Sequence, residues 1–421
     1  MIDRDLLARD ARHVWHPYSR ATAPPPLPVV RASGAYLHTP DGRAVLDAIS
    51  SWWVTLHGHG HPAIAAAVAA QAAALEQVIF AGCTHEPAVR LAERLTSLAP
   101  AGLDRVFYSD DGSTAVEVAL KIALQYWRIA GQDRDIIIAM EHAYHGDTVG
   151  AMSVSARGVF TAPFGAMMFD VARIPEPSSG DSLAALDALL DRDGGRCAAL
   201  ILEPMLLGAG GMRMYDAATL ARIAHRATDA GVLVIADEVL TGFGRTGPLF
   251  ACEHADVTPD LLCLSKGLTG GFLPLGATLL TSRIASTFDG RSPFGTLYHG
   301  HSYTANPIAC AAALASLDLL DEACAERRDT IADAHRRGLA TIRADSRVRA
   351  PRAIGTVAAF DLAGEVGYLS DAAAGLAAFA LDRGVLVRPL GNVVYVLPPY
   401  CITDGELAHI YGVIAEWLDS A

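Results

Sequence analysis

The sequence predicts an α/β fold, with a large domain built on a mostly parallel sheet and a smaller α+β domain. Short apolar runs such as 232–236 and 261–264 have the length and branched composition of buried parallel strands. From about residue 90, runs of this kind alternate with segments of helical character. The end of the chain instead mixes short strands with helices, which is typical of a second, smaller unit.

At 421 residues the chain is too long for one small core, so we expect closely packed domains. Residues 1–55 are assigned to an N-terminal arm and hairpin that belong with the small domain. Residues 56–310 form the large domain, and residues 311–421 complete the small domain.

Within residues 1–31, a short amphipathic start is expected to lead into an extended arm, because prolines crowd residues 21–30. A hairpin with an Asp-Gly turn is predicted over residues 35–47. The adjacent Trp52 and Trp53 are either core residues or the wall of an apolar substrate pocket. A helix rich in alanine then begins at Pro62.

A strand at 106–108 leads into a helix that is predicted to run from about Gly112 to Trp127. Gly112 and Ser113 lie where this helix begins. The free N–H groups and the positive end of the helix dipole suit a phosphate there. A plain N-cap is the alternative, and both can hold because the same N–H groups can serve a bound phosphate.

Two further strands, at 136–140 and 198–202, end in residues with possible functional roles. Tyr144 follows the first strand and precedes His-Gly, so its ring either lies flat against a planar cofactor or belongs to the core. Glu203 follows the second strand directly.

Asp237 and Lys266 form the central pair of the sequence. Each follows a predicted buried strand, and 266 − 237 = 29 residues separate the acid from the amine. One crossover fits that gap, so both side chains emerge at the carboxyl edge of one sheet, where α/β folds bind ligands. Pyridoxal 5'-phosphate needs a lysine to hold its aldehyde and a carboxylate to keep its ring nitrogen protonated. Unrelated charges at two strand ends are the alternative.

Beyond Lys266 we expect a strand at 276–280 and a long helix from Pro307 to about Arg328. The small domain is expected to contain a helix to about residue 340, strands around 355–360, a helix near 371–383, and a strand pair at 385–388 and 393–396.

The composition restricts the partners. A formal net charge of −13 argues against nucleic acid and anionic membranes, and leaves small molecules. Seven scattered cysteines without CxxC spacing fit a reducing cytoplasm, and neither a disulfide framework nor a zinc site is expected. The histidines at 57, 59 and 61 lack further ligands at metal-binding spacing, so no metal is expected. The apolar runs are too short or too interrupted to span a membrane.

Several ordered motifs resemble the class III, or ω-amino acid, aminotransferases of pyridoxal-phosphate fold type I. The motifs are YHGDT at 144–148, EP at 203–204, ADEVLTGFGRTG at 236–247, LSKG at 264–267 and HSYTANP at 301–307. The similarity covers nearly the whole chain.

The resemblance implies a role for each residue near the cofactor ring. Lys266 would hold the cofactor and then act as general base, which requires a partly neutral amine. Asp237 would hold the ring nitrogen, and Tyr144 would cover the ring face and take part in catalysis. Glu203 would belong to the same cofactor site.

The resemblance also implies how the phosphate is bound and that the protein is a homodimer. Gly112 and Ser113 would bind the phosphate from within one chain. The loop of Ser302 would reach across the two-fold axis to the phosphate of the other subunit, so that each active site needs both chains.

Finer motifs resemble the family members that act on 8-amino-7-oxononanoate in biotin synthesis. They are WHPY at 15–18, SSWW at 50–53, ALQYW at 123–127, GAGGMRMY at 208–215 and RPLGNVVYVLPPY at 388–400. This acceptor is a long apolar chain ending in a carboxylate, so Trp52 and Trp53 suit the chain and Arg388 suits the carboxylate. The resemblance implies further substrate-binding residues at Tyr18, Asp147, Gly300 and Tyr395.

The amino donor stays open. Members that use S-adenosylmethionine carry Gly-Pro-Thr-Phe where this chain has GHSY at 300–303, and lysine-using members resemble this variant. We favour S-adenosylmethionine, with lysine as the alternative. An aminotransferase for ornithine, 4-aminobutyrate or β-alanine, a catalytically silent dimeric homologue, and a racemase or aminomutase on the same fold are the competing hypotheses.

Overall fold

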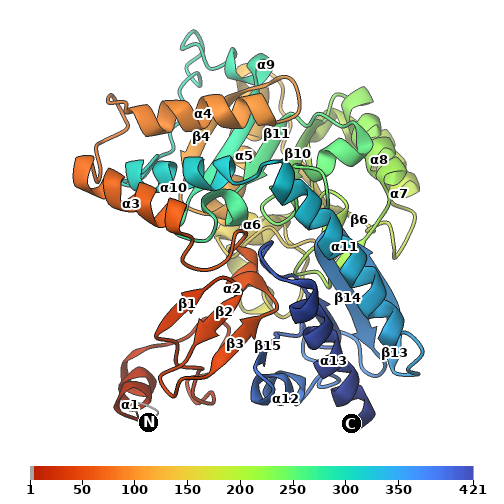
Figure 1. Ribbon diagram of the computed structural model, residues 1–421. Coiled ribbons are helices and arrows are strands. Elements are labelled where there is room, and N and C mark those ends of the chain that lie inside the picture. Colours follow the sequence, from red (N-terminus) through yellow and green to blue (C-terminus); the bar gives the residue numbers. More distant parts are fainter. Residues whose placement is uncertain (1–3, 421) are drawn as a thin grey trace.

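The computed structural model describes residues 4–420 and is built around a seven-stranded sheet (Figure 1). Within this sheet β12 is antiparallel to both of its neighbours, whereas the other neighbouring strands pair in parallel. The predicted α/β fold with a mostly parallel sheet is therefore confirmed. The strands, in their order across the sheet, are β4 (Leu103–Ser109), β12 (Gly276–Thr281), β11 (Leu261–Leu264), β10 (Leu233–Asp237), β7 (Cys197–Leu202), β5 (Ile136–Met140) and β6 (Ala172–Ile174).

The central strands are apolar throughout because both of their faces are covered. In β10, Leu233 and Ile235 pack into the core that contains α5, and Val234 packs into the core beside α7 and α8. The helices of the large domain are α3 (Pro62–Ala74), α4 (Glu86–Leu98), α5 (Gly112–Ile129), α6 (Val149–Val154), α7 (Ser182–Asp193), α8 (Ala217–Asp229), α9 (Ser282–Ala285) and α10 (Pro307–Asp318). Shorter elements are η1 (Ala162–Met167), η2 (Gly194–Arg196), η3 (Ala251–Ala255), η4 (Lys266–Thr269), β8 (Leu206–Leu207) and β9 (Arg213–Met214).

Both ends of the described chain lie in a second region, in the lower part of Figure 1. The predicted hairpin forms as β2 (Tyr36–His38) and β3 (Ala44–Asp47), and β3 also pairs in parallel with β15 (Val385–Leu386). This pairing joins the N-terminal strands to the C-terminal part of the chain. The other elements here are α1 (Arg4–His13), β1 (Arg31–Ser33), α2 (Ser50–Trp53), α11 (Glu322–Ile342), β13 (Val348–Ile354), β14 (Val357–Leu362), α12 (Leu376–Asp382), β16 (Val393–Val396) and α13 (Asp404–Ser420).

Two sequence-based expectations for the C-terminal region are wrong. The helix predicted to run from 307 to about 328 is divided into α10 and α11, because the Asp321 side chain accepts the Cys324 N–H and starts a new helix. The strands predicted as a pair lie in different sheets, since β15 joins β3 and β16 joins β14. The domain boundaries at residues 55 and 310 stay a prediction.

Among residues 4–420, no helix is both long and apolar enough to cross a membrane.

Candidate active site

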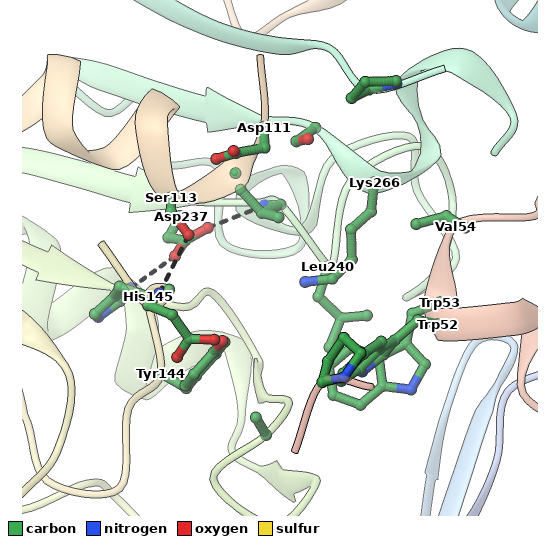
Figure 2. A pocket seen from close by; sticks show the side chains of 18 of the residues that line it. Trp52, Trp53, Val54, Asp111, Ser113, Tyr144, His145, Asp237, Leu240 and Lys266 are labelled. Carbon is green, nitrogen blue, oxygen red and sulfur yellow. Dashed lines mark hydrogen bonds and ion pairs between the residues drawn. The ribbon is translucent and has the colours of Figure 1, made fainter. Parts of the chain in front are cut away.

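A cavity of about 560 Å³ opens where β10 and β11 end. Figure 2 shows side chains that line it, drawn from distant parts of the sequence. A volume of this size suits a small-molecule cofactor together with substrate. The sequence-predicted site residues in the lining are Tyr18, Trp52, Trp53, Gly112, Ser113, Tyr144, Asp147, Glu203, Asp237, Lys266, Arg388 and Tyr395.

Asp237 is the last residue of β10, and its side chain is buried beside the cavity. The Val239 N–H donates to Oδ1 at 3.1 Å, and His145 Nδ1 lies 2.7 Å from Oδ2. These two contacts hold the carboxylate in one orientation at the edge of the sheet, where it can pair with the ring nitrogen of a bound cofactor.

Lys266 begins η4 directly after β11, and the register of β11 against β10 brings it to the same sheet edge as Asp237. Its Nζ lies 5.1 Å from the centre of the Trp53 ring. Burial lowers the pKa of Lys266, although the charges of Asp237 and Glu203 oppose this effect. In the described part of the chain, no hydrogen bond or ion pair occupies this amine, so it is available to an aldehyde.

The start of α5 forms another side of the cavity. Asp111 is the N-cap, and its carboxylate accepts the Thr114 N–H at 2.8 Å. A side chain at Gly112 would meet Val239, because a Cβ there would lie 2.6 Å from Cγ1 of that residue. The N-cap expected at this helix start is therefore present, and Gly112 and Ser113 lie in the cavity lining beside it, where a phosphate site stays a prediction.

Tyr144, Tyr18 and Asp147 form a polar cluster in the cavity. The Tyr18 hydroxyl donates to the Asp147 carboxylate and lies 3.2 Å from the Tyr144 hydroxyl. Burial, with the hydrogen bond to Asp147, raises the pKa of Tyr18 to about 12, and burial also raises the pKa of Tyr144. Both groups therefore remain neutral phenols near neutral pH.

Glu203 is buried behind Tyr144. Its two carboxylate oxygens accept the backbone N–H groups of Tyr144 and Gly208, each at 2.9 Å. Burial raises its pKa to about 7, with the nearby Asp237 carboxylate acting in the same direction. The side chain ties two loops of the cavity wall together.

Aromatic rings and one cation form the opposite wall. Trp53 is 4% exposed and donates through Nε1 to the Tyr395 hydroxyl at 3.1 Å, whereas Trp52 is 40% exposed. Arg388 Cζ lies 4.1 Å from the centre of the Trp52 ring. Trp53 is thus both a core residue and a wall residue, and Arg388 combines a flat apolar contact with a guanidinium that has no hydrogen bond among residues 4–420.

The cavity lining also contains residues that the sequence did not identify as site residues, among them His145, Phe160 and Tyr368. His145 was visible in the motif after Tyr144, and its distance from Asp237 comes only with the fold. Phe160 and Tyr368 lie in loops without a recognisable pattern, and their ring centres are 4.5 Å apart. The tertiary contact alone identifies them.

Gly300 and Ser302 do not line the cavity within the described chain. The Ser302 carbonyl accepts a hydrogen bond from the Gln77 side chain at 2.5 Å, on the exterior of the large domain. Ser302 is expected to bind the cofactor phosphate of a second subunit and Gly300 to bind substrate, and both roles stay a prediction.

Comparisons with known proteins agree with this geometry. The family model for class III aminotransferases matches residues 18–418. An adenosylmethionine-8-amino-7-oxononanoate aminotransferase of Synechococcus elongatus is 52% identical, over 97% of this chain and 98% of the relative. The protein of the same name from Mycobacterium leprae is 40% identical, over 97% and 95% of the two chains.

Solved structures give the same result. The adenosylmethionine-8-amino-7-oxononanoate aminotransferase of Methanocaldococcus jannaschii superposes with a TM-score of 0.94 at 34% identity, over 100% of both chains. A PLP-bound amine transaminase from an uncultivated Pseudomonas species has a TM-score of 0.90 at 33% identity, covering 97% of this chain and 98% of that one. The chain therefore belongs to the class III aminotransferases, enzymes whose cofactor is pyridoxal 5'-phosphate.

Proposed function

We propose that the protein transfers an amino group from S-adenosylmethionine to 8-amino-7-oxononanoate, giving 7,8-diaminononanoate for biotin synthesis. The observation that carries this proposal is the pairing of a buried amine with a distant cation in one cavity. Lys266 lies at the sheet edge, and Arg388 lies across the aromatic wall beside Trp52. The names of the similar proteins from Synechococcus and Methanocaldococcus support the same substrate pair.

The residues present fit the cofactor. Asp237 would pair with the ring nitrogen, the start of α5 with Ser113 would bind the phosphate, and Tyr144 would cover the ring. Glu203 would support this site by holding the loop of Tyr144. When bound, pyridoxal 5'-phosphate supplies an aldehyde that reacts with amines and a ring that accepts electrons from the bonds of the substrate carbon.

The work of the chain is then to orient groups and to move one proton. Lys266 would act as the general base that takes the proton from the substrate α-carbon and later returns it. The burial that lowers its pKa increases the neutral, basic fraction of this amine. Tyr18 and Asp147 would orient the incoming substrate amine from the opposite side of the cavity.

The aromatic wall fits the proposed acceptor. An apolar chain would lie along Trp52 and Trp53, and its terminal carboxylate would meet the guanidinium of Arg388 in a bidentate pair. Tyr395, held by Trp53, would complete this side of the pocket.

We propose a homodimer in which Gly300 and Ser302 complete the partner's site. The side chains around this loop support the proposal, because Tyr298 is 79% exposed and Tyr303 is 61% exposed in the single chain. Large exposed aromatic residues of this kind are typical of surfaces that a partner covers. A reducing cytoplasm is the proposed compartment, and the free cysteines among the described residues support it.

The single half-reaction tests the function. The purified protein with its cofactor is mixed with S-adenosylmethionine or with lysine, without acceptor, and the cofactor absorbance is followed. We expect conversion by S-adenosylmethionine alone, and turnover once 8-amino-7-oxononanoate is added. Conversion by lysine alone would reassign the donor to the type of loop that carries His301. Conversion by neither donor would contradict the proposal and favour the ornithine, 4-aminobutyrate or β-alanine alternatives.

A further inference from the structure

The turn that carries Trp52 and Trp53 has an unfavourable backbone conformation. Ser50, Ser51 and Trp53 have φ angles of +50°, +60° and +67°, in the left-handed region that residues with a side chain rarely adopt. Such strain persists only where surrounding contacts enforce it. Both tryptophans line the active-site cavity, and Figure 2 shows them together at its edge. The position of the aromatic wall therefore depends on the contacts that hold this turn.

Asp47, the last residue of β3, supplies two of these contacts. Its side chain is buried, and its carboxylate faces the backbone of the turn. Oδ1 accepts the Ile49 N–H at 3.0 Å, and Oδ2 accepts the Ser51 N–H at 2.6 Å. Because these N–H groups lie before and within the strained stretch, the carboxylate fixes the path of the chain into the turn.

His59 is a third donor to the same carboxylate. Its Nε2 lies 2.8 Å from Asp47 Oδ2, and because a carboxylate can only accept, the proton lies on Nε2. The backbone of His59 is fixed separately, since it exchanges two hydrogen bonds with Gly34, at 2.7 and 3.1 Å. The imidazole therefore reaches Asp47 from a segment whose own position does not depend on the turn.

The glycines on both sides of His59 make this approach possible. Gly58 and Gly60 have φ angles of +89° and +63°, and a Cβ at Gly58 would lie 3.0 Å from the Gly34 carbonyl oxygen. His57, two residues away, has a different partner, because its Nε2 lies 3.2 Å from Ser316 Oγ. Within the alternating histidines and glycines of 57–61, it is thus His59 that contacts the carboxylate of the turn.

The other side of the turn contacts the groups proposed to bind the acceptor. The Trp52 ring centre lies 4.1 Å from Arg388 Cζ and 5.5 Å from the Tyr18 ring centre. Trp53 donates to the Tyr395 hydroxyl at 3.1 Å. A shift of the turn would change the spacing of all these groups. The contacts of Asp47 are therefore placed to control the shape of the acceptor side of the cavity.

We propose that Asp47 and His59 are positioning residues for the acceptor, which hold the strained turn at 50–53 so that Trp52 and Trp53 form the aromatic wall. This inference rests on the proposed binding of 8-amino-7-oxononanoate along that wall. It predicts that weakening the support changes acceptor binding and leaves the chemical step intact.

The variants of His59 are chosen by the atoms they keep. His59→Leu removes the donor at similar volume, whereas His59→Gln leaves an N–H near the position of Nε2. We expect the leucine variant to raise the acceptor KM about tenfold, as for loss of a hydrogen bond to a charged group, with kcat and the donor half-reaction nearly unchanged. The glutamine variant should stay close to wild type in all three values.

Hydrogen–deuterium exchange of the cofactor-loaded protein supplies a readout besides activity. Peptides covering 48–54 contain the two N–H groups that Asp47 accepts, and in His59→Leu these peptides should exchange faster while those of β10 keep wild-type rates. The matched control is His335→Leu, because His335 is also buried and pairs with Tyr411 and Thr356. It should lower the melting temperature without changing the acceptor KM or the exchange at 48–54.

Wild-type exchange at 48–54 in His59→Leu would overturn the inference, and so would faster exchange with an unchanged acceptor KM. If that variant does not fold, His59→Gln is compared with His59→Asn, whose amide is one carbon shorter and does not reach the position of Nε2. Equal values for these two variants would contradict the inference.

Trp52→Ala separates this result from the proposed function. A wild-type acceptor KM in that variant would refute the aromatic wall as the acceptor site. A raised acceptor KM in Trp52→Ala, together with wild-type values in His59→Leu, would refute only the positioning role of Asp47 and His59.

Discussion

The two walls of the active-site cavity differ in burial and in origin. The polar wall, with Asp237 only 4% exposed, consists of strand ends and a helix start of the large domain. The aromatic wall contains the buried Trp53 and Tyr395 and the 40% exposed Trp52, and it comes from α2, β16 and the loop that carries Arg388. One wall is fixed by a packed sheet, and the other can vary in sequence without disturbing that sheet.

We infer that the polar wall serves the chemical step and that the aromatic wall selects the substrate. Charged groups with fixed neighbours are needed where a proton moves, and a buried sheet edge supplies such neighbours. Substrate choice requires shape and one cation, which the rings of the aromatic wall and Arg388 provide. Changes in the polar wall should therefore reduce the rate for every substrate, and changes in the aromatic wall should discriminate between acceptor and donor.

The largest effect is expected for Asp237→Asn. The variant keeps the shape of the side chain and removes the charge that faces the cofactor, so kcat should fall about 10²- to 10³-fold for all substrates. Steady-state kinetics with each substrate checks this expectation. The matched control is Asp260→Asn at the start of β11, whose carboxylate accepts the Val234 N–H and does not line the cavity. Equal losses in the two variants would show that the effect is structural.

The unfolding free energy of the protein should depend on pH because of Glu203 in the polar wall. The pKa of Glu203 is raised by burial to about 7 from 4.5, so the folded state binds the proton more tightly. The stabilisation from this group is complete below pH 4.5 and is lost as the pH rises through 7. Between pH 5 and pH 8, wild type should lose up to about 3 kcal/mol of unfolding free energy relative to Glu203→Gln.

Urea unfolding at both pH values measures this difference. Glu326→Gln, an exposed change on α11, serves as the control and should follow the wild-type profile. If the unfolding free energy of Glu203→Gln changed with pH as much as that of wild type, the raised pKa of Glu203 would not be the cause of the pH dependence.

Arg388→Ala should affect the acceptor selectively. Loss of a hydrogen bond to a charged group costs about 1.5–3 kcal/mol, which corresponds to a roughly ten- to hundredfold rise in KM for 8-amino-7-oxononanoate. The half-reaction with the amino donor should change much less. Arg349→Ala, on the exposed strand β13, is the control. Equal losses for donor and acceptor would mean that the acceptor carboxylate binds elsewhere.

The smallest effect is expected at the rim of the aromatic wall. Phe160 and Tyr368 join a loop of the large domain to a loop of the C-terminal region, with ring centres 4.5 Å apart. An aromatic pair contributes about 0.5–1.5 kcal/mol, so Phe160→Ala should raise the acceptor KM about two- to tenfold and leave kcat nearly unchanged. Phe164→Ala, exposed and outside the cavity lining, should change neither value. A larger fall in kcat than in affinity for the acceptor would show that Phe160 affects the chemical step more than acceptor binding.

The contrast between the walls also explains what the sequence could predict. Asp237 and Lys266 follow apolar runs with the length and branched composition of buried parallel strands, so their position at one sheet edge was predictable. Arg388 and the tryptophans were identified from motifs. Phe160 and Tyr368 were not, because a contact between two irregular loops leaves no periodic signal.

Two further limits have physical causes. The break between α10 and α11 depends on a single capping aspartate within a continuous helical pattern, so Asp321 was overlooked. The partner of His145 depends on the spacing of β5 and β10 across the sheet, which the order of residues along the chain does not encode.

The central claim is that Lys266 holds the cofactor, and the composition of the chain allows a direct test. The sequence contains only one other lysine, Lys121, whose ammonium donates to the Tyr298 carbonyl at 2.8 Å on the exposed side of α5. The protein is incubated with pyridoxal 5'-phosphate, reduced with borohydride, digested and mapped by mass spectrometry. The account predicts stoichiometric labelling of Lys266 with Lys121 unlabelled. Labelling of Lys121 alone, or of neither lysine, would contradict it.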